Sequence, residues 1–134
     1  MEASARGTRE CGGHTLGITS TVYDCASNSW LDEEISCSSS MERLMKLVDY
    51  GDGFVVLKGG TGTLLELSYC WEMAHKGFLN KPVILVGPHW HGLVRCLEKE
   101  GDFQGSRNFE GCVRYLQMAD SPSEVLKILQ RELL

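Results

Sequence analysis

The sequence predicts an α/β protein in which a parallel sheet is flanked by helices. Two short, continuously apolar segments, residues 54–57 and 83–86, suit parallel strands that are covered on both faces. Segments with apolar residues at helical spacing alternate with the strand-like segments along the chain. No hairpin signal such as Asn-Gly joins two strand-like segments, so successive strands are expected to run in the same direction.

The first part of the chain begins with a predicted helix over residues 2–10, which Gly12 and Gly13 end because glycine adopts the left-handed conformation cheaply. A strand is expected over residues 14–20. Residues 23–34 are rich in Ser, Asn and Asp without a sustained period, which predicts a long surface loop whose acidic run 32–34 is solvated. Three serines at 38–40 are candidate N-caps for a helix that ends at Gly51, and Arg43 falls off its apolar stripe.

The second part repeats the alternation of strand and helix. A helix from about residue 63 to 76, closed by Gly77, follows the strand at 54–57, and another runs from about 90 to 99 after the strand at 83–86. A polar stretch then extends to residue 110, and a strand is expected near 113–117. Ser121 is the expected N-cap of the last helix, with Pro122 at its first position.

Length and composition favour a single domain over residues 1–134. The 43% hydrophobic content supports one core, and the net charge of -5 without a basic run argues against a nucleic-acid partner. No apolar stretch approaches the roughly 20 residues that cross a membrane, and the N-terminus lacks the apolar core of a secretory signal. Six widely spaced cysteines predict reduced thiols and a cytoplasmic location.

A glycine-rich turn after the strand at 54–57 is the strongest chemical signal. Residues 58–66 read Lys-Gly-Gly-Thr-Gly-Thr-Leu-Leu-Glu. Glycines let backbone N–H groups approach a ligand, and the start of the next helix carries about +0.5 charge, so a phosphate is the expected guest. The glycines could instead serve only a tight turn. The Lys-Ser/Thr pair of a Walker loop is missing after the last glycine.

Glu66 has two interpretations. A carboxylate near the start of a helix can simply complement the helix dipole. Beside a phosphate pocket it can instead hold a sugar hydroxyl or orient water, since a fixed negative charge stabilises the cation-like transition state of glycosidic cleavage.

Other polar and aromatic residues are not predicted to form a site. His89 and His91 lack a second ligand cluster, so they are expected to form a strand-to-helix turn bordering the cleft and not a metal centre. Tyr69 and Trp71 are expected to pack in the core or between subunits.

The glycine-rich turn and Glu66, residues 58–66, resemble the LOG family of phosphoribohydrolases, which are often mislabelled lysine decarboxylases. The signature of that family is P-G-G-x-G-T-x-x-E. The family also has a catalytic arginine in a pattern like E-R-K-x-x-M, and counting back without gaps places Glu42, Arg43 and Leu44 there. Two elements at the family's separation are more specific than one, and the resemblance runs from Met1 to the last helix. It implies a Rossmann-like fold that lacks the family's first strand and Gly-rich loop.

The resemblance implies hydrolysis of the N-glycosidic bond of an adenosine 5′-monophosphate type nucleotide to free base and ribose 5-phosphate, without a metal or other cofactor. Arg43 would bind and polarise the nucleotide, and Glu66 would act at the ribose. Lys58 replaces the family's proline and is predicted to help bind the anion. The phosphate-binding residues would be Lys58, Gly59, Gly60, Thr61, Gly62 and Thr63. A homodimer or higher homo-oligomer is expected.

A different class of protein stays open at this point. Related Rossmann-like proteins bind nucleotides or carry molybdenum cofactor without cleaving anything, and the same glycine motif suits them. Leu44 stands where the substrate-releasing enzymes have lysine, and the missing first strand suggests a fragment or a short form. Release of adenine from adenosine monophosphate would distinguish an enzyme from a binding module.

Overall fold

A computed structural model describes residues 2–23, 28–104 and 112–134 of the protein. The chain forms two compact units, Met1–Tyr50 and Gly51–Leu134, and each has its own parallel sheet. The predicted α/β class with parallel strands is therefore confirmed. The prediction of one domain over residues 1–134 stays a prediction.

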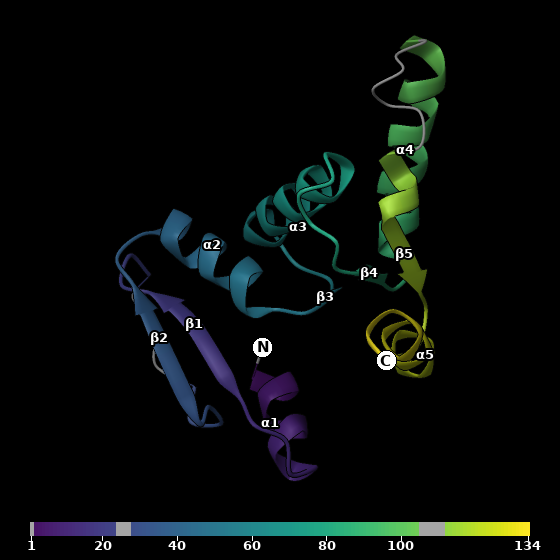
Figure 1. Ribbon diagram of the computed structural model, residues 1–134. Helices are drawn as coiled ribbons and strands as arrows, with labels where there is room; N and C mark the ends of the chain where they lie inside the picture. The colour runs from purple at the N-terminus through teal and green to yellow at the C-terminus, as the bar shows by residue number, and fades with distance from the viewer. Residues whose placement is uncertain (1, 24–27, 105–111) are drawn as a thin grey trace. The chain divides into compact units, whose positions relative to one another are not determined.

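In the Met1–Tyr50 unit, two parallel strands pair beneath a helix. Strand β1 (Leu16–Ser20) pairs with β2 (Glu33–Cys37), and α2 (Ser40–Tyr50) packs on both strands (Figure 1). Helix α1 (Glu2–Glu10) precedes them. As predicted, a left-handed glycine follows α1, since Gly12 has a φ of 78°.

Strand β2 is a correction to the sequence prediction, which placed residues 33 and 34 in a surface loop. Its sequence, EEISC, carries two acidic residues and buries only Cys37. The strand forms because its backbone pairs along the whole length of β1, from Leu16 opposite Glu33 to Ser20 opposite Cys37. Tertiary pairing thus overrides a weak strand propensity. Residues 24–27 of the predicted loop lie outside the described residues.

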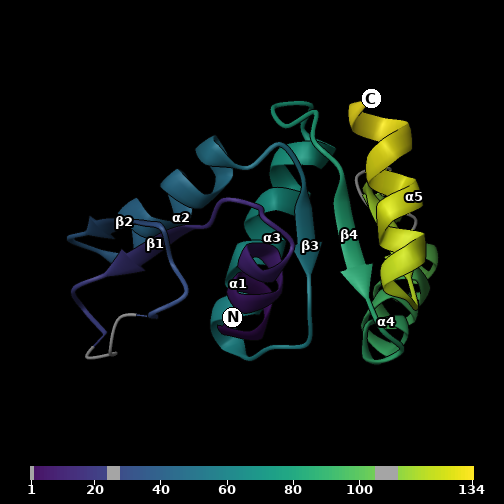
Figure 2. The same cartoon turned by 90° about the horizontal axis from the view of Figure 1, so that it is seen from below.

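In the Gly51–Leu134 unit, three parallel strands are paired in the order β3-β4-β5. Figure 2 shows β3 (Phe54–Val56) beside β4 (Val83–Val86), and β4 also pairs with β5 (Leu116–Ala119). Strand β4 is buried on both faces, as predicted, with no exposed surface from residues 83 to 85. The helices of this unit are α3 (Thr61–His75), α4 (His89–Gln104) and α5 (Pro122–Leu133), with a short 3₁₀-helix at Cys112–Tyr115.

Three features of this unit differ from the prediction: the burial of one strand and the boundaries of two other elements. Strand β3 is not covered on both faces, because Val55 is 42% exposed and the strand has only one partner among the described residues. Helix α4 continues to Gln104, past the expected end at residue 99. The predicted strand at 113–117 is a 3₁₀ turn followed by β5, which begins at Leu116 because that residue pairs with Val83. The rest of the predicted polar stretch, residues 105–111, lies outside the described residues.

The start of α5 follows the prediction closely. The Ser121 hydroxyl accepts a hydrogen bond from the Glu124 amide, and Pro122 occupies the first helical position. The Glu124 carboxylate accepts one from the Asp120 amide at 2.8 Å. This reciprocal capping satisfies two backbone donors and fixes the residues that leave β5.

Candidate functional site

The glycine-rich turn connects β3 to α3 at the carboxyl edge of the sheet. Helix α3 begins at Thr61, two residues earlier than predicted, so Thr61, Gly62 and Thr63 form its first turn. Gly60 is the N-cap in an extended conformation, and no side chain of the described residues caps the helix. The first-turn amides of an α-helix have no acceptor within the helix. At α3 these donors lie on an exposed surface, residues 59–62.

The glycines of this turn have different surroundings. A Cβ at Gly59 would lie 2.0 Å from the Thr63 Oγ1, so the threonine side chain folds over a position that only glycine can fill. A Cβ at Gly60 or Gly62 would meet nothing within 4 Å. The packing of the described residues therefore does not require glycine at these two positions. Their small size leaves the uncapped amides open to an approaching ligand.

Glu66 lies on the second turn of α3, two residues further from the helix start than predicted, because the helix begins earlier. Its side chain is half-buried. Cys70 is one turn further along the same face. Burial, together with the negative charge of Glu66, raises the pKa of the Cys70 thiol to about 11. The carboxylate is therefore close enough to the thiol to disfavour its ionisation.

Lys58 is the last residue before the glycines and is exposed. It makes no ion pair with another described residue. Its ammonium group is thus available to an anion at the helix start, although the side chain is solvated in the structure.

Arg43 belongs to the other unit, on the first turn of α2. Its Nε donates a hydrogen bond of 2.9 Å to the carbonyl oxygen of Ile18 in β1, and its side chain is half-buried. This bond fixes the guanidinium against the sheet of its own unit. The glycine turn leads into the helix that carries Glu66, whereas the predicted convergence of Arg43 with them stays a prediction.

Two further strand ends lie beside the glycine turn. Because Val56 pairs with Leu85 and Val86 pairs with Ala119, the chain leaves β3, β4 and β5 at the same edge. His91 Nε2, at the start of α4, lies 3.4 Å from the Asp120 Oδ1, just after β5. The sequence placed His91 at this edge but gave no sign of its pairing with Asp120, which is 29 residues further along the chain.

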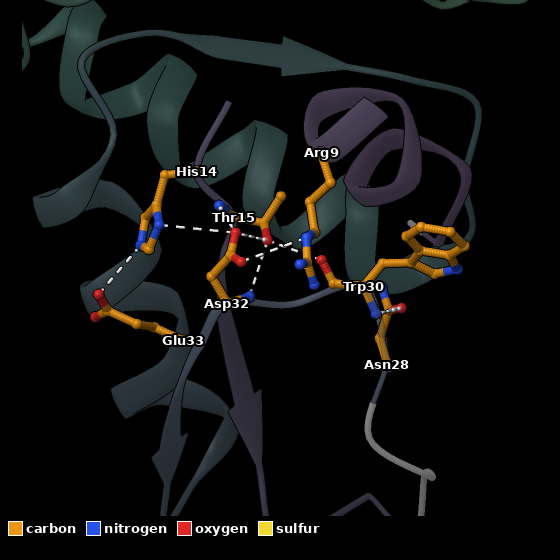
Figure 3. A network of polar contacts seen from close by, with 7 residues as sticks. All are labelled: Arg9, His14, Thr15, Asn28, Trp30, Asp32 and Glu33. Carbon is orange, nitrogen blue, oxygen red and sulfur yellow. Dashed lines mark hydrogen bonds and ion pairs between the residues drawn. The ribbon is translucent and has the colours of Figure 1, made fainter. Parts of the chain in front are cut away.

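A second polar cluster lies in the Met1–Tyr50 unit and surrounds Asp32 (Figure 3). The Asp32 carboxylate accepts hydrogen bonds from the Thr15 amide at 2.9 Å and from the Thr15 hydroxyl at 2.8 Å. The Arg9 Nε lies 3.4 Å from the Asp32 Oδ1. The hydrogen bonds from Thr15 lower the pKa of Asp32. This contact corrects the prediction of a solvated acidic run. The cluster fixes residues 28–32 to the start of β1.

A shallow hollow of about 400 Å³ opens beside this cluster. It is lined by Arg9, Glu10, Ser29 and Trp30. None of these residues was predicted to belong to a site.

The described residues contain no group of three or more His, Cys, Asp and Glu side chains arranged to hold a metal ion. In the same part of the chain, every helix is too short or too polar to span a membrane.

Residues 1–129 match the protein family described as "Possible lysine decarboxylase". The chain belongs to this family. Curated relatives carry the name of the LOG phosphoribohydrolases, so the LOG family predicted from the glycine motif and Arg43 is confirmed.

Three relatives of this LOG-family chain are named cytokinin riboside 5′-monophosphate phosphoribohydrolase. The one from Mycobacterium tuberculosis is 38% identical over 97 residues, which cover 69% of this chain and 52% of the relative. The one from Mycobacterium marinum is 29% identical over 106 residues, which cover 76% of this chain and 57% of the relative. The one from Arabidopsis thaliana is 32% identical over 106 residues, which cover 76% of this chain and 46% of the relative. The chain thus spans about half the length of the curated relatives it matches.

Proposed function

We propose that this LOG-family protein hydrolyses the N-glycosidic bond of an adenosine 5′-monophosphate type nucleotide, releasing free base and ribose 5-phosphate. The observation that carries the proposal is the uncapped start of α3, where Gly60 and Gly62 face open space. The names of the relatives support the reaction type, since all three are phosphoribohydrolases of a nucleoside 5′-monophosphate.

The phosphate would bind at the start of α3. The amides of Thr61, Gly62 and Thr63 have no acceptor within the helix, and the helix dipole favours an anion there. The exposed Lys58 adds a positive charge beside the same turn. Hydrogen bonds to a charged group contribute about 1.5–3 kcal/mol each, so a few such contacts suffice to hold a nucleotide phosphate.

Glu66 would act at the ribose. In the reaction the bond between C1′ and the base nitrogen breaks, a water oxygen bonds to C1′, and the proton from water ends on the base. The transition state has cation-like character, which a nearby carboxylate stabilises. Glu66 follows Thr63 by three residues on the same helix, which supports a role at the sugar attached to the phosphate. Arg43 is proposed to bind and polarise the nucleotide.

The test is to incubate the 134-residue chain with adenosine monophosphate and to follow free adenine by chromatography. We expect adenine release that Glu66→Gln abolishes while nucleotide affinity changes little, because the carboxylate acts mainly in the transition state. Binding without release by the unaltered chain would instead indicate a non-catalytic nucleotide-binding module. If the chain neither binds nor cleaves the nucleotide, the proposal is wrong.

A further inference from the structure

The register of the sheet places the start of α4 beside the glycine turn. Val56 of β3 pairs with Leu85 of β4, so Lys58 and Gly87, each two residues further along, lie just beyond the ends of neighbouring strands. Neighbouring strands lie about 4.8 Å apart. The chain then turns tightly at Gly87, whose φ is 100°, and α4 begins at His89. A ligand whose phosphate occupies the glycine turn therefore has the first turn of α4 as its neighbour.

His91 lies on the first turn of α4, next to a residue that anchors the helix. Trp90, the residue before it, is only 4% exposed and anchors the first turn of α4 in the core. The His91 Nε2 lies 3.4 Å from the Asp120 Oδ1. The backbone of Asp120 is fixed, because its amide donates a hydrogen bond to Glu124 and because the Gly87 amide donates one of 2.9 Å to the carbonyl oxygen of the preceding residue, Ala119, while the Asp120 side chain itself is exposed.

The contact with Asp120 decides which hydrogen bond His91 can offer a ligand. An ionised carboxylate can only accept, so in the neutral imidazole Nε2 carries the proton and Nδ1 keeps its lone pair. Nδ1 makes no hydrogen bond with any other described residue. The His91 side chain is 37% exposed, so a ligand can reach part of the ring from solvent. A hydroxyl group is the complementary partner.

We propose that His91 Nδ1 accepts a hydrogen bond from a ribose hydroxyl of the bound nucleotide, with Asp120 as the positioning residue. The inference rests on the proposed function, because the phosphate in the glycine turn brings the ribose next to α4. The pair of His91 and Asp120 would make the protein prefer ribonucleotides over their deoxy analogues. A site built to hydrogen-bond a hydroxyl rejects a ligand that lacks it, because the acceptor is then left unpaired.

The test uses the 134-residue chain and isothermal titration calorimetry with adenosine monophosphate, its 2′-deoxy and 3′-deoxy analogues, and inorganic phosphate. We expect the unaltered chain to prefer the ribonucleotide over one of the deoxy analogues by about tenfold, as for one hydrogen bond. His91→Ala should lower this preference several-fold and leave the affinity for inorganic phosphate unchanged. Asp120→Ala should lower the preference for the ribonucleotide less than His91→Ala does, because the imidazole ring remains but loses its orientation.

Two further variants keep the result interpretable. His91→Phe retains an aromatic ring without the acceptor and should behave like His91→Ala. His75→Ala is the matched control, because His75 is the last residue of α3, at the end away from the glycine turn, and should leave the preference unchanged. If folded His91→Ala and His91→Phe keep the full preference against both analogues, the role of His91 is wrong while the proposed function stands. If the unaltered chain binds neither phosphate nor nucleotide, both proposals fail.

Discussion

At the scale of single residues, the glycines of the turn differ in what a side chain would meet. The hydrogen of Gly59 faces Thr63, whereas those of Gly60 and Gly62 face open space, and none of the three has a positive φ. Backbone conformation therefore does not account for glycine at positions 60 and 62. Access of a ligand to the helix start does account for it, and this explanation can be tested by adding one methyl group.

Gly62→Ala is expected to stabilise the fold and to weaken phosphate binding. Alanine in a helix is about 0.5–1 kcal/mol more favourable than glycine, and the new methyl group meets no atom within 4 Å. Urea unfolding and phosphate titration measure the two effects. Gly7→Ala is the matched control, because Gly7 also lies in a helix, α1, with nothing within 4 Å. The control should stabilise equally without changing affinity; an unchanged affinity in Gly62→Ala would contradict the role of the turn.

Gly59→Ala, unlike Gly62→Ala, should destabilise the fold. Its Cβ would lie 2.0 Å from the Thr63 Oγ1 and 2.6 Å from the Thr63 Cβ, so the turn or the threonine must move. Such overpacking costs about 1–3 kcal/mol. A drop in the urea midpoint measures this cost, and Gly59→Ala combined with Thr63→Gly should recover most of it. No recovery in the double variant would show that the contact with Thr63 is not the cause.

The cysteines are expected to differ in reactivity. Cys70 is 4% exposed and burial raises its thiol pKa to about 11, so it carries little of the reactive thiolate at pH 8. Cys37 is 1% exposed, whereas Cys11 and Cys96 are exposed. Iodoacetamide labelling followed by peptide mass spectrometry should modify Cys11 and Cys96 before Cys37 and Cys70. Labelling of Cys70 at the same rate would contradict the burial of this face of α3.

At the scale of elements, helix α2 has a well-formed cap. The Ser39 hydroxyl accepts a hydrogen bond from the Glu42 amide at 3.1 Å, and the Glu42 carboxylate accepts two from Ser38 at 2.8 Å. The predicted run of serine caps is thus used, with Glu42 as its partner. Because Arg43 follows directly, the cap also fixes the turn that carries this proposed nucleotide-binding residue.

The cap predicts a dependence of stability on pH. Hydrogen bonds from Ser38 lower the pKa of Glu42 from 4.5 to about 2. A depressed pKa in the folded state means that Glu42 stabilises the fold above about pH 4.5 and that this contribution is lost as the pH falls towards 2. Urea unfolding should find Glu42→Gln less stable than the unaltered chain at pH 7, with a difference that shrinks below pH 4.5. A difference independent of pH would contradict the ionised cap.

Elements with strong local signals could be predicted from the sequence, and elements that depend on distant pairing could not. The glycine stop after α1, the buried strand β4 and the Ser121 cap of α5 all follow from their own residues. Strand β2 depends on pairing with β1, and the start of β5 depends on its register with β4. Neither partner is visible from local propensity, so both elements were missed or misplaced.

At the scale of the whole molecule, the candidate site is only partly local. The glycine turn, Lys58 and Glu66 are neighbours along the chain, so the sequence could group them. The pairing of His91 with Asp120 comes from the order of the parallel strands, which local patterns do not reveal. Arg43 lies in the other compact unit, and its approach to the nucleotide stays a prediction, as does the homodimer.

The claim that the start of α3 binds a phosphate is tested most directly by recording amide ¹H–¹⁵N spectra of the 134-residue chain during titration with adenosine monophosphate. If the start of α3 binds the phosphate, the amide signals of Thr61, Gly62 and Thr63 should shift together and saturate, and inorganic phosphate should shift the same three signals. Saturable binding of the nucleotide that leaves these three amides unmoved would contradict the account.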